Sequence, residues 1–205
     1  MIGAYLKIRE LKLPWKLAAI IVVSTLVIVI DRYRTLFFVE AFDHLFLFLI
    51  IPLVLVIILR EKPAAYGFRL GDWKAGLAFT LMGWILMSIL MLFVARLPDF
   101  LNYYSPASGP VLQLIVRNGI DLFGWEFLFR GLLLFALLPV CGPIAIILQA
   151  VPFTIAHIGK PELETISCIF GGPLLGYVAW RTRSFLYPFM IHWFLTTITV
   201  LISAR

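Results

Sequence analysis

Long apolar runs separated by short polar connections limit what this chain can fold into more than any other feature. Of its 205 residues, 62% are hydrophobic and only 14% are charged. A water-soluble core cannot hide so many apolar side chains, and runs of about 20 residues match the thickness of a bilayer. We therefore expect an all-α, polytopic transmembrane helix bundle with a polar cavity, forming a single domain over residues 1–205. Seven spans are predicted, at about 15–31, 36–59, 75–95, 111–137, 143–157, 163–180 and 184–203.

The basic residues lie mostly in the short connections and predict an orientation. Residues 1–14 form a basic N-terminal arm, and the loop 60–74 carries further Lys and Arg between Pro and Gly. A cytoplasmic N-terminus places most Lys and Arg on the cytoplasmic side. We expect a multi-pass protein of the plasma (inner) membrane, with the lipid bilayer as a partner. The weakly charged loop 96–110 is expected to be irregular because of its Pro, Ser and Gly residues.

Composition also argues against several other functions. The net charge of +6 is accounted for by orientation in the bilayer, so no nucleic-acid partner is predicted. Cys141 and Cys168 are isolated, without a second Cys or a His at metal-ligand spacing. Neither a disulfide framework nor a cysteine zinc site follows, and no cofactor is expected.

A carboxylate and a guanidinium lie inside the fourth apolar run, in the sequence W-E-F-L-F-R-G at residues 125–131. Spacing of four residues puts Glu126 and Arg130 on one helix face, where each partly neutralises the other. The run also contains Arg117 and Asp121. Because such polarity is costly against lipid, this helix is expected to lie inside the bundle and to mark either a helix-linking ion pair or a functional site.

Two histidines in later apolar runs, His157 and His192, can exchange protons near neutral pH. Hydrolysis of a peptide bond requires a base for water, a proton for the leaving amine and hydrogen-bond donors for the oxyanion. A desolvated glutamate beside histidine can supply the first two. Glu40 and His44 are also four residues apart, but their place near a membrane boundary favours an interfacial role. The H-E-x-x-H and G-x-S-x-G motifs are absent.

Together these residues resemble the CAAX prenyl protease and bacteriocin-processing family (CPBP or Abi, type II CAAX endopeptidases) of glutamate-dependent intramembrane proteases. That family carries E-E-x-x-x-R, F-x-x-x-H and H-x-x-x-N on three helices. The matching residues, in order within a core of about 111–203, are Glu126 and Arg130, then Phe153 and His157, then His192. The resemblance implies a membrane-embedded protease.

Two positions depart from the family pattern. Trp125 stands where the family has its first Glu, usually the catalytic base, and Thr196 stands where it has Asn. A bacterial branch that resembles the myxosortase-like processing proteases shares W-E-F-x-F-R-G and H-x-G-K-P-E-x-E. The Trp is therefore a pattern in its own right, and the base has to be reassigned.

Glu126 is the first candidate for the base because it is the carboxylate that the motif retains. Glu162 and Glu164, which follow His157, are an alternative acid or base. Asp121 is another, since it lies one turn before Trp125 and on the same helix face.

The resemblance also implies roles for the other matching residues. His157 would share the base work or position the water, and His192 would face the oxyanion. Thr196 keeps a hydroxyl donor in place of the amide, with Phe153 in support, and Arg130 would orient the glutamate.

We therefore expect an intramembrane endopeptidase that acts on a membrane-anchored protein or peptide, such as a sorting tail, a leader or a CAAX-like segment. No metal is expected, although two histidines and a glutamate resemble a zinc set that chelators would reveal. The rival hypothesis is a catalytically inactive family member acting as a membrane scaffold or immunity-type binder. A small transporter would show a repeat, and none is evident.

Overall fold

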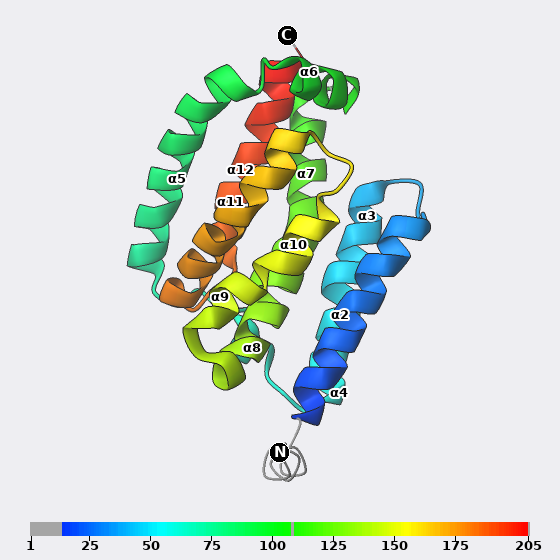
Figure 1. The fold of residues 1–205 in the computed structure, drawn as a ribbon, viewed down its shortest axis with the longest axis vertical. Coiled ribbons are helices and arrows are strands. Elements are labelled where there is room, and N and C mark those ends of the chain that lie inside the picture. Colours follow the sequence, from blue (N-terminus) through cyan, green and yellow to red (C-terminus); the bar gives the residue numbers. More distant parts are fainter. Residues whose placement is uncertain (1–13, 108, 205) are drawn as a thin grey trace, which may run out of the picture.

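The computed structural model describes residues 14–107 and 109–204, and every regular element within them is a helix (Figure 1). The predicted basic arm lies outside this part of the chain, apart from Pro14. The helices are, in chain order, α2 (Trp15–Tyr33), α3 (Glu40–His44), η2 (Leu45–Ile50), α4 (Ile51–Ile58), η3 (Pro63–Tyr66), α5 (Trp73–Val94), α6 (Pro98–Tyr104), η4 (Ser105–Ala107), α7 (Val111–Glu126), η5 (Phe127–Leu133), α8 (Leu134–Cys141), η6 (Gly142–Ile144), α9 (Ala145–Leu148), α10 (Ala150–Ala156), α11 (Glu162–Thr182) and α12 (Leu186–Ser203).

Several of these helical stretches are long and apolar enough to cross a membrane. They are Glu40–Ile58, Trp73–Val94, Val111–Ala156, Glu162–Thr182 and Leu186–Ser203. The 46 residues of Val111–Ala156 turn back between α8 and α9, so that α7 and α10 run in opposite directions in Figure 1. The expected all-α membrane bundle is confirmed, whereas the count of seven spans stays a prediction.

The reversal between α8 and α9 follows from local sequence. Gly142 has φ of +61°, a conformation that residues with a side chain rarely adopt. Pro139 and Pro143 flank it and cannot donate the backbone hydrogen bonds that would continue the helix. The chain therefore turns here, and α9 and α10 return beside α11.

The helix with the Glu-Arg pair lies in the interior of the bundle, as the sequence predicted. Every residue of η5 is buried, in a π-helical segment that continues α7. α7 and η5 contact the α2 to η2 hairpin on one side and α11 and α12 on the other. This central position carries the polar side chains of α7 and η5 away from lipid.

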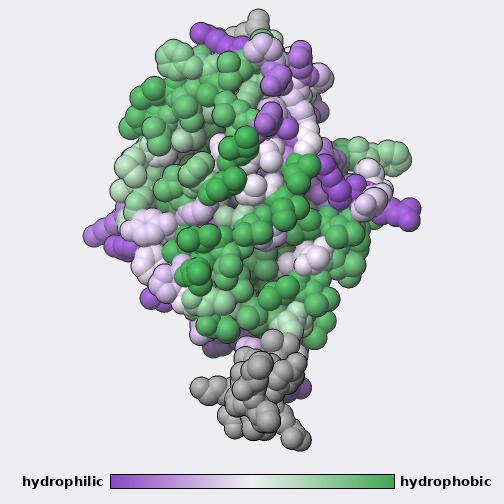
Figure 2. Space-filling view, viewed as in Figure 1, coloured by the Kyte–Doolittle hydropathy of each residue, from purple (hydrophilic) through white to green (hydrophobic). Residues whose placement is uncertain are grey.

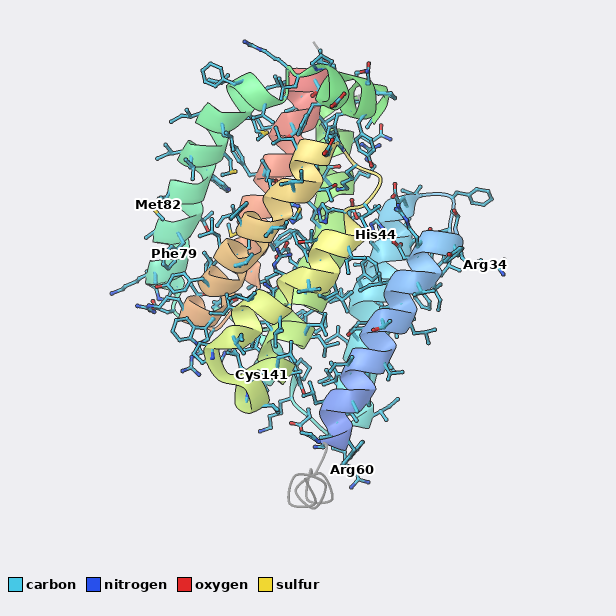
Figure 3. The ribbon with its side chains drawn as sticks, in the orientation of Figure 1. Arg34, His44, Arg60, Phe79, Met82 and Cys141 are labelled. Carbon is cyan, nitrogen blue, oxygen red and sulfur yellow. The ribbon has the colours of Figure 1, made fainter. Side chains whose placement is uncertain are left out.

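The outer surface is apolar, as a bilayer requires. Hydrophobic side chains cover most of the face in Figure 2, and hydrophilic ones gather mainly near its edges. On α5, along the left edge of the bundle in Figure 3, Met82 points away from the other helices and is 60% exposed. The fold thus buries polar groups and presents apolar ones to lipid.

Glycines let α11 approach its neighbour closely. A Cβ at Gly172 would lie 2.8 Å from the Cβ of Ala150, and one at Gly176 would lie 2.6 Å from Nε2 of Gln149. The amide of Gln149 also donates to the Gly172 carbonyl at 3.0 Å. These contacts hold α11 against α9 and α10, the latter carrying Phe153.

The expectation of an irregular loop at 96–110 was wrong in part, because α6 and η4 form there. Pro98 stands in the first turn of α6, where its fixed φ suits a helix start. Phe100 and Tyr104, four residues apart, bury one face of this short helix against Leu114 and Val200. Tertiary packing therefore stabilises a helix that the turn-forming composition does not suggest.

Candidate active site

Glu126 and His192 form a hydrogen-bonded pair inside the bundle. Oε1 of Glu126 lies 2.7 Å from Nδ1 of His192 and accepts a second hydrogen bond from Nη1 of Arg130 at 3.0 Å. Glu126 and Arg130 are 0% exposed and His192 is 6% exposed. Because a carboxylate oxygen accepts hydrogen bonds, this contact makes Nδ1 of His192 the donor and leaves the lone pair of the neutral ring on Nε2.

Arg130 is oriented by an aromatic ring as well as by the carboxylate. Its guanidinium carbon lies 3.7 Å from the ring centroid of Phe153. Among the described residues, Nε and Nη2 of Arg130 and Oε2 of Glu126 have no hydrogen-bond partner. The pair is thus held through one oxygen, and the second carboxylate oxygen is uncommitted.

His157 ends α10 and is held in one tautomer. Its Nδ1 lies 2.8 Å from the carbonyl oxygen of Phe153, and since that oxygen can only accept, Nδ1 carries the proton. The neutral ring therefore keeps a lone pair on Nε2. The rings of His157 and His192 lie 6.3 Å apart at 25° to one another. The tertiary structure thus brings together three of the residues predicted from the motifs.

Two cavities meet at these histidines. A polar cavity of about 690 Å³ extends toward α2, α3 and the loop after α10. An apolar cavity of about 340 Å³ extends between α5, α11 and α12. The residues that line both are Tyr104, His157, His192 and Thr196. The imidazoles therefore stand between a water-compatible space and an apolar one.

The structure separates the three alternative carboxylates. Asp121 lines the polar cavity. Glu164 lines the apolar one, where its Oε2 accepts from the Tyr104 hydroxyl at 2.6 Å. Glu162 is exposed on the first turn of α11 and lines neither. Glu126, although paired with His192, is also absent from both linings, so it reaches the cavities through the imidazole.

Lys160 and Tyr104 are two further ionisable residues that line the polar cavity. Burial lowers the pKa of the Lys160 ammonium, but Glu164, 3.4 Å away, and other acidic groups raise it by more, so the net shift is upward. Burial, reinforced by Glu164, raises the pKa of the Tyr104 phenol above its usual value. Both groups therefore stay protonated at neutral pH.

His44 lines the polar cavity with His157 and His192, although its sequence position indicated only an interfacial role. Figure 3 shows it on the side of α3 that faces the bundle. It pairs with Asp31 of α2 and Asp121 of α7 rather than with Glu40. Asp31 ends the first apolar run and His44 begins the second, so a short turn between the two helices would bring them together. This was the sequence signal that could have predicted the pair.

No group of three or more His, Cys, Asp or Glu side chains within residues 14–107 and 109–204 is placed to share a metal ion. Glu126 hydrogen-bonds to His192, and the ring of His192 packs against that of His157. Retention of activity in a chelator remains the expected outcome.

Residues 107–198 match a family model described as type II CAAX prenyl endopeptidase Rce1-like. The match is somewhat shorter than half of the chain and contains all the motif residues. Comparisons with curated proteins and with solved structures gave no match. The bundle and the match support a CAAX-type intramembrane protease, a peptide hydrolase with a membrane-associated substrate. More particularly, the match supports the CAAX protease and bacteriocin-processing family that the motifs resemble.

Proposed function

We propose that the chain is an intramembrane endopeptidase that hydrolyses a peptide bond with water activated by the Glu126–His192 pair. The observation that carries this proposal is the 2.7 Å contact between Glu126 Oε1 and Nδ1 of His192, a residue that lines both cavities. A buried carboxylate that holds one imidazole nitrogen makes the other a better base and stabilises the imidazolium.

In the proposed reaction, His192 Nε2 takes a proton from water, and the hydroxide attacks the scissile carbonyl carbon. Glu126 and Arg130 keep their charges and stabilise the imidazolium through the buried hydrogen bond. His157, held by Phe153, positions the water through its Nε2 lone pair, and the Thr196 hydroxyl donates to the oxyanion. Collapse of the tetrahedral intermediate then breaks the C–N bond and requires a proton for the amine.

We propose that the substrate enters with an apolar segment in the cavity between α5, α11 and α12, while water reaches the histidines from the polar cavity. A sorting tail, a leader peptide or a CAAX-like segment fits this arrangement. Prenylated substrates are the least favoured in a bacterial host. With the N-terminus in the cytoplasm of a plasma (inner) membrane protein, the loop after His157 faces outward, which favours exported substrates and the myxosortase-like branch.

The test uses the full chain in phosphatidylethanolamine and phosphatidylglycerol vesicles, with a pool of N-palmitoylated peptides analysed by mass spectrometry. Glu126→Gln and His157→Ala are expected to lower cleavage by about 10²-fold or more. Glu61→Gln is the matched control, because Glu61 pairs with Lys16 at a partly exposed site. Cleavage by the parent and the control alone supports the protease, also when a chelator is present.

Binding of peptides without cleavage by any variant, the parent included, would overturn the protease and favour the membrane scaffold or immunity-type binder. Equal cleavage by the parent and Glu126→Gln would exclude the Glu126–His192 pair as the base. In that case Glu162→Gln and Glu164→Gln identify whether a carboxylate of α11 has the role instead.

A further inference from the structure

A second buried proton-holding cluster lies beside the proposed base. His44 is 5% exposed, its Nε2 lies 3.0 Å from Oδ1 of Asp31, and its Nδ1 lies against Oδ1 of Asp121. The indole Nε1 of Trp125 lies 2.9 Å from the same Nδ1. These four residues line the polar cavity together with His157 and His192.

The partners of His44 suit both protonation states of its ring. In the protonated ring, Nδ1 donates to Asp121 and Nε2 donates to Asp31. In the neutral ring, Nε2 still donates to Asp31, while Nδ1 accepts from the Trp125 indole N–H. Gain or loss of the Nδ1 proton therefore leaves neither ring nitrogen of His44 without a partner, because Asp121 and Trp125 alternate at Nδ1.

Trp125 connects this cluster to His157, the residue proposed to position the water. Its ring centroid lies 5.3 Å from that of His44 and 5.4 Å from that of His157, edge to face in both cases. One indole thus separates the two imidazoles. Asp121 is the carboxylate of the cluster on α7, and its side chain is 26% exposed on the wall of the polar cavity, against 20% for Asp31. It is therefore the group able to meet a bound substrate.

We propose that the Asp31–His44–Asp121 cluster supplies the proton to the leaving amine, with Asp121 as the donor that contacts the substrate and His44 as the positioning residue behind it. This inference rests on the proposed function. His44 Nδ1 passes its proton to the Asp121 carboxylate, and the carboxyl group so formed gives that proton to the amine nitrogen as the C–N bond breaks. His44 becomes neutral and accepts from Trp125. The proton that His192 removed from water returns to His44 through the polar cavity, so the cycle closes.

A purely structural cluster would hold α2 and α3 against α7 and affect every reaction of the site equally. A proton donor has a narrower effect. It is needed when the leaving group is an amine, and it is not needed when the leaving group departs as a stable anion. The nature of the leaving group therefore separates the two roles.

The experiment compares two substrates in vesicles: a palmitoylated peptide from the same pool, and the 4-nitrophenyl ester of the same palmitoylated segment. His44→Gln and Asp121→Asn are expected to lower peptide cleavage by about 10²-fold while ester hydrolysis changes by less than about threefold. Trp125→Phe, which removes the partner of neutral His44, is expected to give a smaller loss of the same selective kind.

Asp43→Asn is the matched control. Asp43 is buried next to His44 on α3, but its carboxylate accepts from the backbone N–H of Phe37 at 2.7 Å and faces the turn instead. It is expected to leave the ratio of peptide to ester cleavage unchanged. If His44→Gln does not accumulate in the membrane, Asp31→Asn replaces it in the comparison. Thermal unfolding of each variant is recorded to check that it is folded.

Equal loss on both substrates in His44→Gln and Asp121→Asn would overturn the proton-donor role while leaving the protease intact. A parent that hydrolyses the ester but not the peptide would also overturn the proton-donor role, because the leaving amine would then not receive its proton. A parent inactive on both substrates would show that the proposed function is wrong, and the donor role would fall with it.

Discussion

Arg130 is among the largest fully buried side chains of the described chain, and its charge is balanced by one carboxylate, Glu126. Removal of one partner of a buried ion pair leaves the other uncompensated. Arg130→Met is therefore expected to lower the free energy of unfolding by roughly 3–5 kcal/mol, measured by denaturant titration in detergent.

The double variant Arg130→Met, Glu126→Gln is the internal control for that measurement. It removes both charges and keeps similar volumes, so it is expected to recover more than half of the lost free energy. If the double variant loses as much free energy of unfolding as Arg130→Met and Glu126→Gln lose in sum, Arg130 is not the counter-charge of Glu126.

At the scale of elements, the contact between α11 and α10 depends on a residue without a side chain. Gly172→Ala places a methyl group 2.8 Å from the Cβ of Ala150, which is attached to the backbone and cannot turn aside. We expect a loss of about 1–3 kcal/mol from this overpacking, measured as a lower thermal midpoint. Gly171→Ala is the matched control.

A Cβ at Gly171 would meet no heavy atom within 4 Å, so this neighbouring substitution only removes backbone freedom from a helix. It is expected to leave the midpoint unchanged or raised. A similar fall of the thermal midpoint in both variants would show that alanine is unfavourable anywhere in this part of α11, and not only where α11 approaches α10.

At the scale of the whole molecule, the arrangement in Figure 1 puts the loop before α5 and the helix after it at opposite ends of the bundle. The 22 residues of α5 span about 33 Å, enough to cross the hydrocarbon core. Asp72 caps the start of α5, and Asp99 lies just after its end. The two residues are therefore expected on opposite sides of the membrane.

Membrane-impermeant maleimide tests this orientation in intact bacterial cells that express Asp72→Cys or Asp99→Cys, with Cys141→Ser as the background. With the N-terminus in the cytoplasm, Asp99→Cys is expected to label from outside, and Asp72→Cys only after permeabilisation. The reverse pattern would show that the distribution of Lys and Arg does not set the orientation of this chain.

The apolar runs determined the class of fold because lipid leaves helices as the only way for such segments to satisfy their backbone groups. The spacing of Glu126 and Arg130 likewise predicted an interior helix, since charge on a lipid-facing side is costly. The motifs named His157 and His192, but not the pairing of His192 with Glu126. Local patterns thus contained the helices and most of the reactive groups.

Only the tertiary structure decided which groups meet. Asp31, His44 and Asp121 lie on three helices, and the turn after α2 and the packing of α3 on α7 bring them together. α6 likewise forms because Phe100 and Tyr104 find apolar neighbours. Sequence periodicity reports which face of one helix is polar, because that depends on residues a few positions apart. Contacts between helices depend on packing across the whole bundle, which no local pattern contains.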